Sequence, residues 1–426
     1  MATFTAEVFQ NEYLPEGATE VNAVVTVTSS GTGGVVASGP ASVAEMIIID
    51  SSGSMDMPGT KMVAARRAAQ AAIDEIVDGA LFAVLAGNTG AQVVYPREPG
   101  LVPMDARTRA EAKQWIDTIR PGGATTLGAW LDVARSMFLT SGARQCHAVL
   151  LTDGKQEGEP PAALDQALSA ADGVFQCDCR GIGEGWVVEQ LRRISTALLG
   201  TVDIVADPAN LAADFGEIMR NSMARGVADV RLRVWAPEGS QVRFVRQVAP
   251  QLDDLTGRGI AVSPLIREFP TGAWADESRD YHVAVAVPIA PIGSERLAAR
   301  VELVVDDQVQ AKGLVRAVWS ENTDLTTRIN PSVAHYTGQA ELASAIQDGL
   351  AARRDGDERT ATLKLGRAAQ LAHESGNDAT IRLLQKVVDI DDPDAGTVRL
   401  KRQVAAADEM ALDTRSTKTI RVHKEP

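Results

Sequence analysis

Five oxygen-bearing side chains stand where apolar segments of this sequence give way to loops. Asp50, Ser52 and Ser54 end the stretch "MIIIDSSGS", and Asp153 follows the apolar run in "CHAVLLTDG". Thr125 lies between them in sequence, in the glycine-bearing loop of "RPGGATTLGAW". Carboxylate and hydroxyl oxygens are hard ligands that suit Mg²⁺, whereas the imidazole and thiolate ligands typical of zinc sites are missing from this set. The five residues therefore predict a Mg²⁺ site, with Mn²⁺ or Ca²⁺ as alternatives.

The prediction requires the ends of the two apolar runs to meet in space. From about residue 43 to residue 225, short apolar strands alternate with amphipathic helices, which predicts a doubly wound, mostly parallel sheet covered by helices on both faces. The run "VAEMIIID" is continuously apolar apart from its glutamate and final aspartate, as is typical of a strand buried on both faces. Ligands of such sheets bind at the carboxyl ends of the strands. We therefore expect Asp50 and Asp153 at one edge.

In their order along the chain, D-x-S-x-S, then a threonine loop, then "LTDG", these segments resemble the metal ion-dependent adhesion site of von Willebrand factor A domains, of a bacterial cytoplasmic type. The resemblance covers about residues 43–224. It implies that Ser52 and Ser54 bind the metal directly through their hydroxyls. It also implies that Asp50 and Asp153 act mainly through waters and hydrogen bonds.

The threonine ligand is assigned from the same resemblance. The family pattern places this ligand three residues before a glycine that corresponds to Gly128, which selects Thr125. The resemblance implies that Thr125 binds the metal directly or through water. Because the loop contains adjacent threonines, Thr126 is the alternative.

These ligands favour docking over catalysis. A metal held mostly by neutral hydroxyls keeps much of its positive charge, so an Asp or Glu of a partner protein can fill its open position. We therefore expect a Mg²⁺-dependent protein–protein interaction module or adaptor, and not an enzyme. The G-x-S-x-G elbow of serine hydrolases is missing around Ser52 and Ser54, and we find no phosphate-binding G-x-x-x-x-G-K-[ST] loop.

Two other functions stay open. One is an accessory subunit of an AAA+ ATPase of the MoxR or chelatase type. The other is an adaptor in a Ser/Thr kinase circuit, because Thr417 and Thr419 lie in the basic stretch "DTRSTKTIRVHK". Forkhead-associated domains resemble the readers that such sites would need, since they clamp a phosphothreonine and sense the third residue after it, here Ile420 or Val422. An unmodified tail is the simpler interpretation.

Outside the α/β segment the chain is typical of a β-sandwich followed by helices. Segments such as "ADVRLRVWAP" and "RLAARVELVVDD" alternate with period two. A lone hairpin is marginally stable, so the N-terminal strands should pair with these later ones and leave the α/β domain inserted in an antiparallel β-sandwich. This layout also resembles vesicle-coat trunk proteins. We expect N-terminal strands over 1–40, the α/β domain over 43–224, the sandwich over 227–320, a small helical region over 332–390 and a mostly flexible tail over 391–426.

Composition excludes some partners. The formal net charge of -14 argues against nucleic acid, and no apolar run is long enough to span a membrane. Three cysteines (Cys146, Cys177 and Cys179) give no disulfide framework and favour a reducing, cytoplasmic compartment. His147 lies in an apolar strand, so we interpret it as a core residue and not as a metal ligand.

Overall fold

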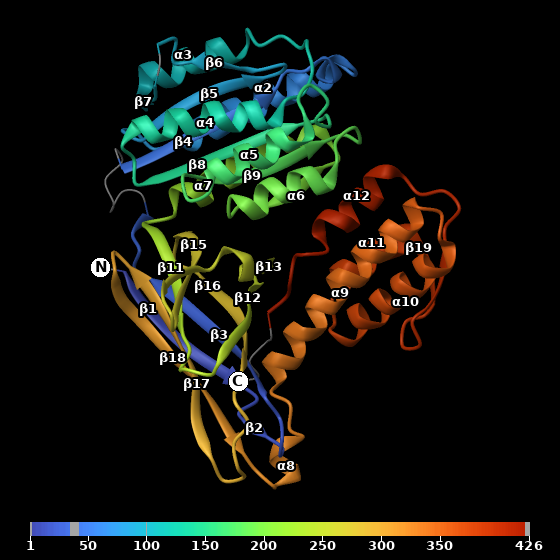
Figure 1. Cartoon of the computed structure of the whole chain (residues 1–426). Helices are drawn as coiled ribbons and strands as arrows, with labels where there is room; N and C mark the ends of the chain where they lie inside the picture. Colours follow the sequence, from blue (N-terminus) through green and yellow to red (C-terminus); the bar gives the residue numbers. More distant parts are fainter. Residues whose placement is uncertain (1, 35–41, 99, 422–426) are drawn as a thin grey trace. The chain divides into compact units, whose positions relative to one another are not determined.

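The computed structural model describes residues 2–34, 42–98 and 100–421 (Figure 1). The chain divides into two compact units. The α/β unit comprises Thr32–Ala228 with Gly272–Ala275, and the sandwich–helix unit comprises the rest of the chain.

The α/β unit contains a largely parallel sheet in the order β10-β9-β8-β4-β5-β6, with β7 also paired to β5. Its strands are β4 (Val43–Asp50), β5 (Leu81–Gly87), β6 (Ala91–Tyr95), β7 (Val102–Pro103), β8 (Gln145–Thr152), β9 (Gln176–Ile182) and β10 (Val202–Val205). β6 and β7 pair antiparallel with β5, and the other pairs are parallel. Every residue of β4 and β8 is buried, which explains their largely apolar character.

Helices cover both faces of this sheet (Figure 1). They are α2 (Thr60–Glu75), α3 (Ala106–Ile116), α4 (Leu127–Ser141), α5 (Pro161–Ala171), α6 (Val188–Ala197) and α7 (Leu211–Met223), with short 3₁₀ helices η2 (Gly53–Asp56) and η3 (Pro208–Asn210). Apolar residues of α2, α3 and α7 share one core cluster with alternate residues of β4. The side chain of Asp105 accepts the backbone N–H of Thr108 and so caps α3. The doubly wound fold predicted from the sequence is confirmed.

The sandwich–helix unit contains two further sheets, ordered β1-β3-β16-β12-β13 and β14-β15-β11-β17-β18-β2. Their strands are β1 (Thr3–Gln10), β2 (Tyr13–Leu14), β3 (Glu20–Ser30), β11 (Val227–Trp235), β12 (Gln241–Ala249), β13 (Asp253–Asp254), β14 (Ile260–Ser263), β15 (Ile266–Trp274), β16 (Ser278–Ala286), β17 (Glu295–Val305) and β18 (Gln308–Trp319), and η4 (Thr256–Arg258) follows β13. β3 lies between β1 and β16, and β2 pairs with β18. The N-terminal strands thus complete sheets that begin again after the α/β segment, which confirms the predicted insertion.

A helical region follows the sandwich. It comprises α8 (Thr323–Thr326), α9 (Pro331–Arg354), α10 (Glu358–Glu374), α11 (Asp378–Val387), the hairpin of β19 (Val388–Asp392) and β20 (Thr397–Leu400), and α12 (Ala406–Arg415). The expectation of a mostly flexible tail over 391–426 is therefore wrong for the described residues of that segment. Val398 of β20 and Leu412 of α12 are buried in one cluster with α9, α10 and α11. A few buried apolar residues are therefore enough to order the described part of this otherwise polar C-terminal segment.

Thr417 and Thr419 are hydrogen-bonded to the β-sandwich. The carbonyl of Thr417 accepts the N–H of Leu252 at 2.8 Å, and the hydroxyl of Thr419 donates to the carbonyl of Val248 at 2.6 Å. Residues 417–419 therefore lie along the β12–β13 connection. Val422, the residue that a reader of phosphorylated Thr419 would sense, lies outside the described residues.

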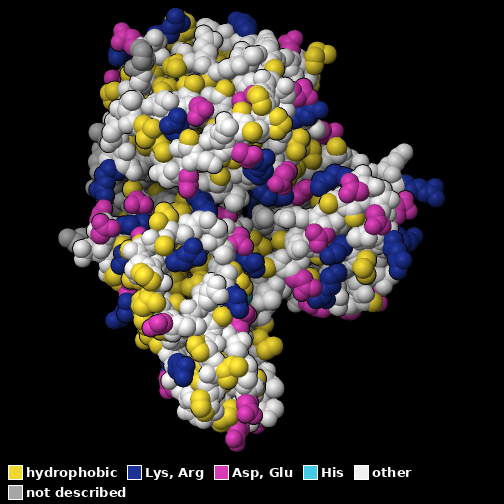
Figure 2. Space-filling view, in the orientation of Figure 1, with side chains coloured by type: hydrophobic (Ala, Val, Ile, Leu, Met, Phe, Trp, Pro, Cys, Tyr) yellow, Lys and Arg dark blue, Asp and Glu magenta, His cyan; other side chains and the backbone are white. Residues whose placement is uncertain are grey.

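Over the described parts of the chain, none of the helices has the length and apolar composition needed to cross a bilayer. On the face drawn in Figure 2, Lys and Arg are interspersed with Asp and Glu. Among its described residues, that face has no broad basic patch of the kind that follows a nucleic-acid backbone.

Candidate metal centre

The carboxyl ends of β4 and β8 bring two buried carboxylates to one edge of the parallel sheet. The strands are neighbours, and Ile49 of β4 lies opposite Leu151 of β8, so both chains leave the sheet at the same level. Asp50 ends β4 and Asp153 directly follows β8, and both residues are 0% exposed. We call this edge, with the loops that follow the two strands and the loop before α4, the crest.

The serines join the two carboxylates. The backbone N–H of Ser52 donates to Asp50 Oδ1 at 2.7 Å, which turns the chain sharply into η2. The hydroxyls of Ser52 and Ser54 lie 2.9 Å apart. The hydroxyl of Ser54 then donates to Asp153 Oδ1 at 2.6 Å. Four of the five predicted residues therefore form one continuous polar cluster.

The threonine loop is tied to the serine loop through the backbone. The N–H of Gly53 donates to the carbonyl of Gly123 at 2.9 Å, and the N–H of Gly122 donates to the carbonyl of Ser51 at 2.8 Å. Thr126 adopts the N-cap position of α4, and its hydroxyl donates to the carbonyl of Asn88 at 2.7 Å. The hydroxyl of Thr126 is thus committed to the loop after β5.

Gly154 shows that Thr125 faces the cluster. A Cβ atom placed on Gly154 would lie 2.8 Å from Thr125 Oγ1, 3.3 Å from Ser54 Oγ and 3.8 Å from Asp50 Oδ2. Oxygens from two separate segments therefore surround one point beside Gly154, and a single methyl group there would fill it. The donor set is made of carboxylate and hydroxyl oxygens, so these residues fit a small, hard cation such as Mg²⁺.

The buried charge at the crest favours a cation. Burial raises the pKa of Asp50, and the neighbouring charge of Asp153 acts in the same direction, although hydrogen bonds from Ser52 and Thr152 oppose the rise. A carboxylate that is costly to ionise in isolation is stabilised by positive charge nearby. Lys61 of α2 supplies one such charge, with its Nζ 2.5 Å from Asp153 Oδ2.

Three residues of the crest were not predicted from the sequence. Thr152 donates its hydroxyl to Asp50 Oδ2 at 2.5 Å, and its position beside Asp153 in "LTDG" was the available signal. Glu159 accepts the N–H of Gly128 at 2.6 Å and so caps α4 beside the threonine loop. Lys61 reaches Asp153 from a helix 92 positions away, which no local motif reveals.

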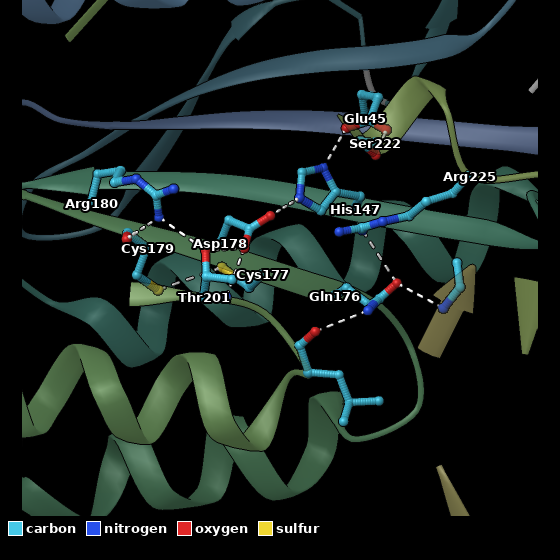
Figure 3. Close-up of polar contacts among 12 residues, drawn as sticks. Glu45, His147, Gln176, Cys177, Asp178, Cys179, Arg180, Thr201, Ser222 and Arg225 are labelled. Carbon is cyan, nitrogen blue, oxygen red and sulfur yellow. Dashed lines mark hydrogen bonds and ion pairs between the residues drawn. The ribbon is translucent and has the colours of Figure 1, made fainter. Parts of the chain in front are cut away.

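A second polar cluster lies at the opposite end of the same strands (Figure 3). His147 Nδ1 lies 2.7 Å from Glu45 Oε2, and its Nε2 lies 2.9 Å from Asp178 Oδ2. Each of these residues is the third of its strand, in β4, β8 and β9. Ser222 of α7 donates to Glu45 at 2.6 Å, and the hydroxyl of Thr201 donates to Asp178 at 2.6 Å. The cluster therefore links three strands to α7.

This second cluster is structural. His147 is 0% exposed, and both of its ring nitrogens face carboxylates, which agrees with its interpretation as a core residue. Burial alone would lower the pKa of His147, but the carboxylates of Glu45 and Asp178 raise it to about 9. In the same way, burial would raise the pKa of Asp178, yet His147 holds it well below its usual range. The two carboxylates therefore favour the protonated form of this buried imidazole, which has no access for a substrate.

Among the described residues, no group of three or more His, Cys, Asp or Glu side chains is arranged to hold a metal ion. The crest is not a group of this kind, because three of its five predicted ligands are hydroxyls. Any cation there would depend on neutral oxygens as much as on carboxylates.

Comparisons with known proteins agree with the geometry. Two family profiles match, the von Willebrand factor type A domain over residues 45–204 and the von Willebrand factor type A C-terminal domain over residues 370–416. The second match covers α11, the β19–β20 hairpin and α12. No curated protein sequence matches this chain.

Solved structures extend the likeness to the whole chain. The von Willebrand factor type A protein from Catenulispora acidiphila is 50% identical in sequence, with coverage of 99% of this chain and 97% of that one and a TM-score of 0.94. The ArnB paralog VWA2 from Sulfolobus acidocaldarius is 14% identical, with 98% of each chain covered and a TM-score of 0.60. The human COPII-coat protein Sec24c is 10% identical, with 88% of this chain and 57% of that one covered and a TM-score of 0.54. The last two matches show a shared fold alone.

Proposed function

Because the chain belongs to the von Willebrand factor type A family, we propose that its crest binds a divalent cation and uses it to dock a carboxylate of a partner protein. The family is a type of protein-interaction and adhesion module, and this proposal gives the present chain a specific docking chemistry. Mg²⁺ is the expected cation, with Mn²⁺ and Ca²⁺ as alternatives. The protein is on this account a non-catalytic adaptor.

One observation carries the proposal. Asp50 and Ser54 come from the end of β4 and the loop after it and Thr125 from the loop before α4, and an oxygen of each lies within 4 Å of the point where a Cβ of Gly154 would stand. Alanine at position 154 would fill this point, and the glycine leaves it open. A role as a helix cap does not explain the serine loop, because Ser52, at the N-cap position of η2, makes no side-chain cap to that helix.

The roles of the residues follow from their partners. Ser52, Ser54 and Thr125 would hold the cation through neutral hydroxyl oxygens. Asp50 and Asp153 would balance its charge, and they orient the serines through the hydrogen bonds described above. A bound divalent cation would supply an electrophilic position for an acidic side chain from outside. The two buried carboxylates, Asp50 and Asp153, are not free general bases, because both already accept hydrogen bonds.

The partner test is a pull-down from host lysate. We expect proteins that the wild-type chain retains with Mg²⁺ to be lost with a chelator and with Asp50→Ala. Asp56→Ala is the matched control, since Asp56 lies in η2 but is exposed and has no described side-chain partner. A partner set that stays the same across wild type, chelator and Asp50→Ala would remove the metal from the mechanism.

The identity of the captured protein separates the remaining alternatives. Capture of an AAA+ ATPase would place the chain as the accessory subunit of such a motor. Capture of a forkhead-associated protein that depends on Thr417 or Thr419, and not on Mg²⁺, would assign the tail as a phosphothreonine docking site. We place the protein in a reducing, cytoplasmic compartment, supported by three free and buried cysteines.

A further inference from the structure

Lys61 is a cation that the structure already places against a buried carboxylate of the crest. Its Nζ lies 2.5 Å from Asp153 Oδ2 and 3.5 Å from the carbonyl of Ser54. The lysine side chain is 16% exposed and its carboxylate partner is 0% exposed. This pair is therefore mostly removed from water, where an ion pair is stronger than on an open surface.

The position of Lys61 is enforced by its neighbours. The lysine lies in the first turn of α2, close behind η2, and its backbone N–H donates to the carbonyl of Pro58 at 3.0 Å. Its stem passes Gly183 in the loop after β9, where an added Cβ would lie 3.4 Å from Lys61 Cε. The two oxygens of Asp153 are divided between Ser54 and Lys61.

We propose that Lys61 is a built-in counter-cation, which competes with the divalent cation for Asp153 and so weakens its binding. This inference rests on the proposed function, because it concerns the same site. A positive charge in contact with one carboxylate of the crest repels a second cation placed beside that carboxylate. Lys61 also forms an ion pair with Asp153 when no metal is bound, so the buried carboxylate is not left as an uncompensated charge.

The charge balance gives Lys61 a role in docking. Asp50 and Asp153 together offset the two positive charges of a divalent cation. No negative charge of this pair then remains to balance the ammonium group of Lys61. A carboxylate from a partner supplies the missing negative charge. Lys61 therefore makes the metal-loaded crest positive until the partner binds, and couples retention of the cation to the arrival of an acidic group.

The test is the Mg²⁺ affinity of the purified full chain, measured by isothermal titration calorimetry. We expect Lys61→Met to bind Mg²⁺ on the order of tenfold more tightly than wild type, because the repelling charge is gone and most of the stem remains. Lys61→Arg keeps the charge and should keep the wild-type affinity. Lys155→Met is the matched control, since Lys155 lies in the loop after β8, is 57% exposed and pairs with Glu157 instead.

Unchanged or weaker Mg²⁺ binding by Lys61→Met, with Lys155→Met at the wild-type value, would overturn the counter-cation role and leave the proposed function intact. Absence of Mg²⁺ binding in wild type and in every variant would overturn the metal site itself, and this inference with it. Thermal unfolding in chelator checks folding, and Lys61→Gln replaces Lys61→Met, with the same expected result, if the methionine variant does not fold.

Discussion

The hydroxyl of Ser54 donates a hydrogen bond of 2.6 Å to Asp153, a residue 99 positions later in the chain. This contact joins the end of β4 to the end of β8 and closes the crest on one side. It also shows why the motif residues act as a group, since each serine lies between a carboxylate and another hydroxyl.

Gly154→Ala should weaken Mg²⁺ binding without removing any ligand. Its Cβ would lie 2.8 Å from Thr125 Oγ1, so the methyl group takes the space that a cation needs. We expect the Mg²⁺ affinity to fall by at least about tenfold in calorimetric titration. Gly90→Ala is the control, because nothing lies within 4 Å of a Cβ at Gly90. Equal affinity in the two variants would contradict the assigned position of the cation.

Thr125→Val and Thr126→Val should have different effects. Valine replaces the threonine hydroxyl with a methyl group of similar size. Thr125→Val should weaken Mg²⁺ binding by about tenfold or more, because a predicted ligand is lost. Thr126→Val should keep the affinity but lower the free energy of unfolding by about 1 kcal/mol, since it removes the hydrogen bond to Asn88. The reverse pattern would assign Thr126 as the ligand.

The free energy of unfolding should fall as pH rises above neutrality. The folded state raises the pKa of His147 from 6.5 to about 9, so the buried imidazolium stabilises the fold fully below pH 6.5 and loses this contribution as pH rises through about 9. Between pH 6.5 and 8.5 the expected loss is about 2 kcal/mol. Chemical denaturation at both pH values measures it.

Two variants check that this pH dependence belongs to His147. Asp178→Asn removes one of the paired carboxylates and should make the loss smaller. His373→Gln alters a half-exposed histidine and should leave the loss as in wild type. A stability profile of wild type that is flat from pH 6.5 to 8.5 would mean that the imidazole is neutral in the folded protein.

Gly87→Ala should destabilise the α/β unit. A Cβ on Gly87 would lie 2.3 Å from the ring of Trp130 in α4. This side chain is fully buried, so it has no free space into which it could move. Overpacking of this kind costs about 1–3 kcal/mol. The midpoint of urea denaturation should shift accordingly, and Gly90→Ala again serves as the neutral comparison. A Gly87→Ala chain as stable as wild type would mean that the packing of α4 on β5 is looser than described.

The sequence alone was enough to predict that the two aspartates of the crest lie together. Asp50 and Asp153 each follow a fully buried strand, and parallel strands in such a sheet end at a common edge, so their convergence could be predicted. The choice between Thr125 and Thr126 could not be made from local physics, because both threonines precede α4 by one or two residues. Tertiary contacts distinguish them, since Thr126 donates to Asn88 and Thr125 lies beside Gly154.

The missed features depend on tertiary packing. Lys61 reads as an ordinary exposed lysine at the start of a helix until η2 and the loop after β9 place its stem beside Gly183. The ion pairs of His147 depend on how three strands align, which the sequence does not reveal. The C-terminal segment is ordered by a few buried residues such as Leu412. The average composition of the segment is polar, so these residues are easily overlooked in the sequence.

The most direct test of the metal site is anomalous X-ray scattering from crystals of the full chain grown with Mn²⁺. The account predicts one anomalous peak at the crest, bounded by the hydroxyls of Ser52, Ser54 and Thr125. It also predicts that Gly154→Ala crystals lose this peak. Crystals saturated with Mn²⁺ that show no peak at the crest, or a peak only elsewhere in the molecule, would contradict it.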